Sequence, residues 1–163
     1  MTETPNFTDS ELFLNRELSQ LSFNFRVLAQ AQDASIPLLE RLKYLCISCT
    51  NLDEFFEIRA ATVKTAMQFK APLLPDNMDP QLALDRIYEI SEKLVNDQYQ
   101  LWNDVLQPAL STEGIRVLNR EHWSGEQRRW LHHYFVHDIL PILSPLALDP
   151  AHPFPQILNK SLN

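Results

Sequence analysis

Two glycines in 163 residues, Gly114 and Gly125, constrain this chain more than any other feature of its composition. Glycine-rich phosphate-binding loops need several glycines within one short turn, because the backbone has to approach the phosphates closely. Gly114 and Gly125 are isolated from each other. The sequence therefore excludes a Walker-type loop and a dinucleotide-binding fingerprint.

The spacing of apolar residues predicts helices in the first part of the chain. One helical face is formed by residues that step by four, three, four and three, with Asn24 lying elsewhere on the helix. A second helix is expected to open at Pro37, where a missing N–H costs nothing. Thr50 and Asp53 resemble a capping box, so a bend or break is expected near residues 48–51 before a third segment. The residues that form the face of the first helix, at steps of four, three, four and three, are Leu14, Leu18, Leu21, Phe25 and Leu28.

A longer helix is predicted over residues 82–106. Three prolines mark residues 71–80 as a loop, and two neighbouring apolar stripes follow it. Such a wide apolar face is typical of a helix that packs against two others. The dipeptide Gln107-Pro108 is expected to end this helix.

The character of the sequence changes after residue 108. A turn is expected at STEG, and residues 115–118 are a candidate for a short strand. Ser124 and Gln127 form a second capping-box pattern, which predicts a helix to about Asp138. The prolines that follow predict an extended or irregular tail. We therefore expect a mainly α chain, with an antiparallel helical bundle at residues 1–108 and the opening of an α+β domain at residues 109–163.

Charge and composition limit the partners and the compartment. The formal net charge is −7, and residues 71–113 hold eight acids and two bases. Such a surface offers no broad basic face to a nucleic acid, so no nucleic-acid partner is expected. The polar N-terminus lacks the features of a signal peptide, and the chain has two cysteines. A cytoplasmic location is expected, with membrane association left open.

Cys46 and Cys49 form a CxxC spacing, but a structural zinc site needs four ligands and no second CxxC exists. The favoured interpretation is a small core residue at Cys46 and a residue near a helix end at Cys49. His133 and His137 share a helical face beside His132, without an HExxH pattern or a clear third ligand. No metal site is therefore predicted.

Asp53, Glu54 and Glu57 have two interpretations. Paired carboxylates act as acid and base when their environments separate their pKa values. Acidic residues in the first turn of a helix instead interact favourably with its dipole. The second interpretation is favoured, and no catalytic residue is predicted in the chain.

Asn51 is the one residue that we single out for binding. Its side chain offers both a donor and an acceptor, which is the combination that an adenine edge requires. A plain N-cap at a helix entrance near Leu52 is the alternative, and composition alone favours it.

Four segments follow one another along the chain: NRELSQLSFNFRVLAQA, IPLLERLKYL, TNLDEFFEIR and DPAHPFPQILNKSLN. Together they resemble the polyphosphate kinase family, in its histidine-phosphorylated form. The resemblance runs from about Asn15 to Asn163 and is strongest in the first 60 residues. Gln20 stands where the family usually has tryptophan, and Glu57 adds an unusual charge.

This resemblance implies a helical amino-terminal domain followed by part of a head domain. It implies an enzyme that moves the terminal phosphate of ATP to a histidine and then to polyphosphate, reversibly and with magnesium. In the family, the asparagine before LDEF contacts the base of ATP, and this position is Asn51. The catalytic histidine, the phosphate-binding arginines and the magnesium ligands are expected in later domains, so the isolated fragment is expected to be inactive.

The implied partners are ATP, ADP, polyphosphate and the remaining catalytic domains, and a homo-oligomer is expected. The alternative is a non-catalytic helical module for protein interaction, supported by the apolar face of residues 82–106. Unpaired strand edges and apolar side chains in the tail predict residues that are mobile or covered by another copy. These are Ile115, Val117, Leu146, Leu148 and Ile157.

Overall fold

The computed structural model describes residues 9–69, 76–145, 148, 154–155, 157 and 161. Every regular element among these residues is helical, which confirms the mainly α fold. The chain divides into two compact units, Met1–Val117 and Leu118–Asn163. The expected domain boundary after residue 108 stays a prediction.

The first long helix, α1, spans Arg16–Gln32 after a short 3-10 turn at Ser10–Leu12. Asn15 caps it, because its Oδ1 accepts a hydrogen bond from the Leu18 N–H at 3.0 Å. The same amide donates through Nδ2 to Asp76 at 2.9 Å, and this bond joins the start of α1 to the segment before α4. Leu14 is 87% exposed, so the predicted apolar face begins one turn too early.

The second rod is continuous from residue 38 to residue 68. It consists of α2 (Leu38–Glu54), a π-helical segment (Phe55–Ala60) and α3 (Ala61–Gln68). The break predicted near residues 48–51 is therefore wrong. Its buried positions run 41, 45, 48, 52, 55, 60 and 63, and the one five-residue step coincides with the π segment. The extra residue in the wider turn keeps the apolar stripe on one face.

The third rod has the same construction. It contains α4 (Pro80–Leu101), a π-helical segment (Trp102–Leu106) and α5 (Gln107–Thr112). Asp79 caps α4 by accepting from the N–H groups of Gln81 and Leu82. The helix end predicted at Gln107-Pro108 is wrong, because Pro108 lies in the first turn of α5, where its missing N–H is tolerated.

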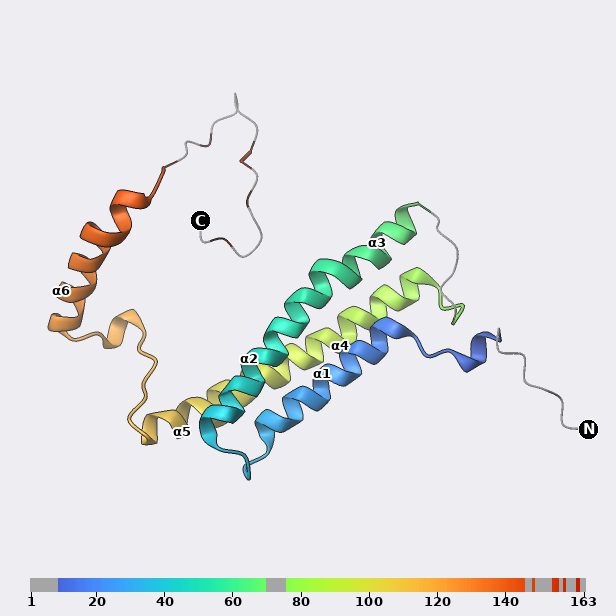
Figure 1. The fold of residues 1–163 in the computed structure, drawn as a ribbon, viewed down its shortest axis with the longest axis horizontal. Coiled ribbons are helices and arrows are strands. Elements are labelled where there is room, and N and C mark those ends of the chain that lie inside the picture. Colours follow the sequence, from blue (N-terminus) through green and yellow to red (C-terminus); the bar gives the residue numbers. More distant parts are fainter. Residues whose placement is uncertain are drawn as a thin grey trace, which may run out of the picture. The chain divides into compact units, whose positions relative to one another are not determined.

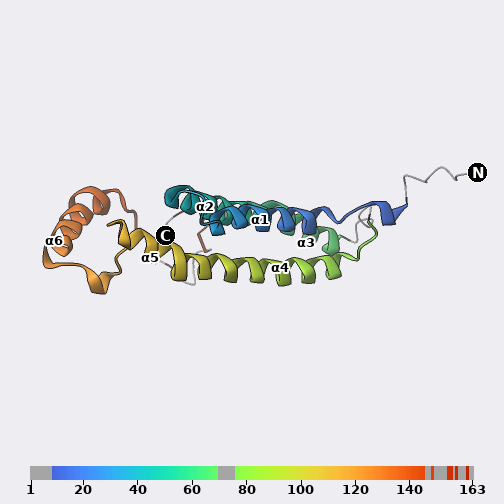
Figure 2. The same ribbon diagram turned by 90° about the horizontal axis from the view of Figure 1, so that it is seen from below.

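These rods form a bundle in the first unit. The rod α2–α3 runs antiparallel to both α1 and α4 (Figure 1), and α1 with α2–α3 lies over α4 (Figure 2). The core contains Leu21, Leu45, Phe55, Ile87 and Leu94. The buried Arg41 of α2 donates from Nε to the Ala31 carbonyl at 2.9 Å, which joins the end of α1 to α2.

A Schellman motif ends α5 at Gly114. The Ile115 N–H donates to the Leu110 carbonyl at 2.9 Å, and the Gly114 N–H donates to Ser111 at 3.1 Å. Gly114 has a φ of +82°, which glycine adopts without strain. Residues 115–118 that follow are not a strand, so that prediction is wrong. An isolated extended segment cannot form a ladder, and no described segment pairs with it.

The second unit is also helical in its described part. It contains 3-10 turns at Arg120–His122 and Leu140–Ile142, the helix α6 (Gly125–Tyr134) and a π-helical segment (Phe135–Ile139). The capping box of Ser124 and Gln127 is confirmed in both directions. No described residue of this unit is buried.

Apolar side chains lie exposed around the end of the first unit and in the second. The predicted set Ile115, Val117, Leu148 and Ile157 is 46–66% exposed, and Leu146 lies outside the described residues. Within the described part of the chain, none of the helices is both long and apolar enough to cross a membrane.

Candidate functional site

Asn51 lies in the last turn of α2 and not at a helix entrance. The prediction of an N-cap position is therefore wrong, and the capping-box reading of Thr50 and Asp53 fails with it. The side chain of Asn51 is half-buried, and its backbone carbonyl accepts from the N–H of Phe55, where the π segment begins. π-helical turns often occur at functional sites, because they displace side chains from the regular helical register.

A buried polar network lies behind Asn51. Its Nδ2 is 3.5 Å from Oδ1 of Asn24, a long hydrogen bond from α2 to α1. Asn24 is 3% exposed and donates through Nδ2 to the carbonyl of Ser48 at 2.9 Å. The hydroxyl of Ser48 accepts from Nε2 of Gln98 on α4 at 2.8 Å. The network thus connects all three rods of the bundle.

Sequence reasoning missed Asn24, Ser48 and Gln98. The stepping apolar residues of the first helix predict a buried face that leaves Asn24 out, and this part of the prediction is wrong. The signal that identifies it is its position: residues 17, 21, 24, 28 and 31 are the buried positions of α1 and repeat at helical spacing.

Asn51 and Asn24 both line a small pocket between α1 and α2. The pocket has a volume of about 140 Å³, and its other lining residues are Gln20, Leu21, Phe23, Glu54 and Phe55. Phe23 is 54% exposed, so one aromatic side chain is accessible beside the amides. Pockets that enclose a whole small-molecule ligand have volumes of roughly 300–1,000 Å³. This pocket is large enough for one edge of a base and not for a whole nucleotide.

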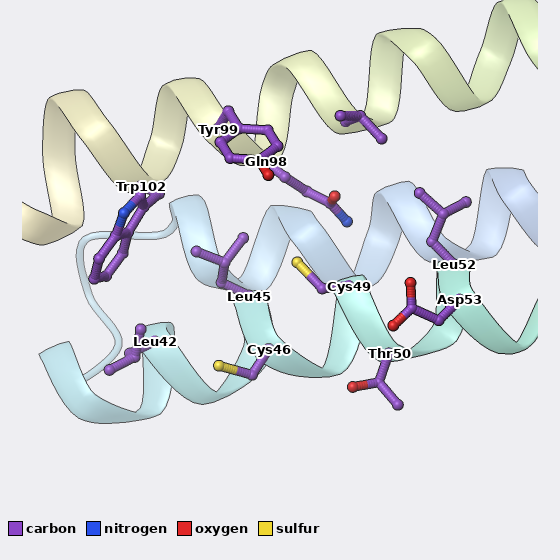
Figure 3. A pocket seen from close by; sticks show the side chains of 11 residues that line it. Leu42, Leu45, Cys46, Cys49, Thr50, Leu52, Asp53, Gln98, Tyr99 and Trp102 are labelled. Atoms are coloured by element: carbon purple, nitrogen blue, oxygen red, sulfur yellow. The ribbon is translucent and has the colours of Figure 1, made fainter. Parts of the chain in front are cut away.

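A larger groove of about 640 Å³ lies between α2 and α4. Figure 3 shows Cys46, Cys49 and Asp53 on α2, with Tyr99 and Trp102 on the facing rod and Gln98 leaving α4 in the direction of α2. Cys46 and Cys49 are free and exposed, so the prediction of a core position for Cys46 is wrong. Although Cys49 is exposed as a residue, the groove walls partly remove its thiol from water, and this desolvation raises the pKa of the thiol; the neighbouring Cys46 and Asp53 act in the same direction.

The other predicted groups do not form a reactive cluster in the described residues. Asp53 and Glu54 lie near the C-terminal end of α2, so the interpretation as first-turn acids is wrong. His133 and His137 do share a face, with ring centroids 4.2 Å apart. Across the described ranges, no three or more His, Cys, Asp or Glu side chains come together as a metal site.

The family models match the chain over two stretches. Residues 13–118 match the N-terminal domain of polyphosphate kinase, and residues 126–163 match the middle domain of polyphosphate kinase. The chain belongs to the polyphosphate kinase family. The resemblance stated from the sequence is therefore confirmed, together with the helical fold of the amino-terminal domain.

Curated members of the family support this assignment. A polyphosphate kinase of Xylella fastidiosa is 60% identical over 96% of this chain, and one of Pseudomonas syringae is 49% identical over 98%. A crystal structure of the polyphosphate kinase of Porphyromonas gingivalis has a TM-score of 0.74 and 30% identity over 89% of this chain. The chain spans about a fifth of the length of these relatives, at 22%, 22% and 20%.

Proposed function

We propose that this chain is the amino-terminal part of an ATP:polyphosphate phosphotransferase and that Asn51 contacts the adenine of ATP there. The single observation that supports the contact is the accessible position of Asn51 in a pocket beside the buried amide of Asn24. An amide offers a donor and an acceptor side by side, which complements the adenine edge.

The size of the pocket indicates which part of ATP this chain contacts and which part the rest of the enzyme contacts. About 140 Å³ accommodates a base edge, so ribose and phosphates lie outside this pocket. Phosphoryl transfer requires cationic groups and Mg²⁺ around the transferred phosphate. In the described residues no three His, Cys, Asp or Glu side chains come together. The phosphorylated histidine, the arginines and the magnesium ligands belong to other domains in this proposal.

The test is the substitution Asn51→Ala in the full-length enzyme. A base contact of this kind contributes about 0.5–1.5 kcal/mol, so KM for ATP is expected to rise roughly two- to tenfold. The kcat is expected to change little, because the base lies far from the transferred phosphate. A variant with unchanged KM for ATP contradicts the proposal. Gln107→Ala on α5 is a matched control outside the pocket.

The isolated 163-residue chain is expected to be inactive. Incubation with ATP, Mg²⁺ and a polyphosphate primer yields no product in this account, because the reacting groups lie elsewhere. ATP binding by the isolated chain is expected to be weak or undetectable, since one base contact provides little affinity. Measurable turnover by the isolated chain is the contrary result.

A non-catalytic interaction module is the second candidate. It is favoured by the groove between α2 and α4, where Tyr99 is 64% exposed. In that case Asn51→Ala causes no nucleotide-specific loss. Homo-oligomer formation and binding to the remaining catalytic domains stay proposals under either reading.

A further inference from the structure

The buried network fixes which way the Asn24 amide faces. A backbone carbonyl only accepts hydrogen bonds, so the Ser48 carbonyl at 2.9 Å requires the Nδ2 end of Asn24. Asn24 is 3% exposed, and reversing its amide brings two oxygens together away from water. The penalty for such an unsatisfied buried group holds Oδ1 of Asn24 toward Asn51.

The orientation of Asn24 is passed on to Asn51. Oδ1 of Asn24 accepts and does not donate, so the end of Asn51 that faces it at 3.5 Å is Nδ2. Among the described residues, nothing donates to Oδ1 of Asn51. One N–H of Asn51 is thus directed at Asn24, while the carbonyl oxygen and the second N–H are left for the pocket.

An Asn51 amide held in this orientation is complementary to one class of purine. On the Watson–Crick edge of adenine, its acceptor matches the exocyclic amino group, and its remaining N–H matches the ring nitrogen N1, which accepts. A 6-oxo purine presents a carbonyl and a ring N–H at the same two places, so both contacts are mismatched. If the Asn51 amide were free to turn over, it would accept either base.

We propose that Asn24 is a positioning residue that fixes the polarity of the Asn51 amide and makes this pocket select 6-amino purines over 6-oxo purines. This proposal rests on the proposed contact between Asn51 and the base. Asn24 also lines the pocket, but its Oδ1 faces Asn51, so in this proposal it acts through Asn51 and not by contacting the base. Its role is exerted through the chain of bonds from the Ser48 carbonyl to Asn51.

The experiment compares ATP with inosine triphosphate in the full-length enzyme. The two nucleotides differ at the 6-position and the adjacent ring nitrogen, and share their phosphates. The wild-type enzyme is expected to have a kcat/KM that is about fivefold or more higher for ATP than for inosine triphosphate, because both hydrogen bonds to the base become mismatches. The difference is expected in KM and not in kcat.

Asn24→Leu tests the positioning role. It removes both hydrogen bonds at similar volume, so the ratio of the two kcat/KM values is expected to fall toward one. Gln98→Met is the matched control, because it breaks the bond to the Ser48 hydroxyl on the other side of the network. It is expected to lower stability and to leave the ratio unchanged. Should Asn24→Leu fail to fold, Asn24→Ala, which adds no bulk, is measured in its place.

The outcomes separate the two proposals. If Asn51→Ala leaves KM for ATP unchanged, the base contact itself is wrong. If Asn51→Ala raises KM for ATP, the positioning role is overturned by either of two results. One is a wild-type enzyme without preference for ATP, and the other is an Asn24 variant that keeps the full wild-type ratio.

Discussion

The two units of this chain differ in how far they bury their apolar side chains. In the first unit, three rods bury Leu21, Ile87 and Leu94 almost completely. In the second unit, α6 leaves Trp130 62% exposed and Ile142 is 78% exposed. Helical periodicity alone is therefore not enough to form a core, because a helix also needs partner helices whose apolar faces match its own.

The largest expected difference between the units concerns the removal of apolar groups. Leu94→Ala in the bundle core should lower the free energy of unfolding by about 2–5 kcal/mol, because it removes buried methyl groups and leaves a cavity. Ile142→Ala in the second unit should change it by less than about 0.5 kcal/mol. Equilibrium denaturation of the 163-residue chain measures both. If the two substitutions lowered the free energy of unfolding equally, the proposed difference in burial between the two units would be wrong.

Two serines provide the next comparison. Ser48→Ala leaves Nε2 of Gln98 without its buried acceptor, and about 1–3 kcal/mol of stability of the bundle should be lost. Ser124→Ala removes the cap of α6 and should cost about 0.5–2 kcal/mol of local helix stability. Denaturation should detect the first change, and amide hydrogen exchange in α6 the second. If either substitution lowers the stability of both units together, the expectation that each substitution affects only its own unit is wrong.

Replacing each of the two glycines by alanine should change helix stability in opposite directions. Gly114→Ala places a side chain at a φ of +82°, which should destabilise the end of α5 by about 1 kcal/mol. Gly125→Ala lies in the first turn of α6 with open space around it, and should stabilise that helix by about 0.4–1 kcal/mol. Circular dichroism and local hydrogen exchange test the pair, and effects of equal sign count against the assigned backbone conformations.

The smallest effect concerns the thiol of Cys49 in the α2–α4 groove. Burial raises its pKa, so the folded chain holds the thiol proton more tightly than the unfolded chain does. The resulting stability is present below the pKa of the unfolded thiol, about 8.5, and is lost as the pH rises through the folded pKa. Alkylation of Cys49 near pH 8 should therefore be slower in the folded chain. Equal rates in folded and denatured chains contradict this.

The helices could be predicted from sequence because their signals are local. The cap of Ser124 and Gln127 and the apolar stripes each lie within a few turns of chain. The π turns at Phe55–Ala60 and Trp102–Leu106 were missed, because only the buried face shows the five-residue step. The strand expected at 115–118 failed, because alternating apolar residues do not supply a partner strand.

Sequence reasoning proposed Asn51 for the candidate site but not the residues around it, and the role of Asn51 stays a prediction. Asn51 was identified through a family resemblance, while the helix entrance proposed for it was wrong. Asn24 and Gln98 were missed, because their partners lie 24 to 50 residues away on other helices. Contacts of that range depend on the packing of the bundle, which helical periodicity alone does not determine.

The most direct test of the account is a structure of the full-length enzyme with a non-hydrolysable ATP analogue. The account predicts that the adenine amino group lies within about 2.7–3.2 Å of Oδ1 of Asn51, while Nδ2 still faces Asn24. An adenine bound away from the α1–α2 pocket, with Asn51 contacting protein atoms alone, would contradict it.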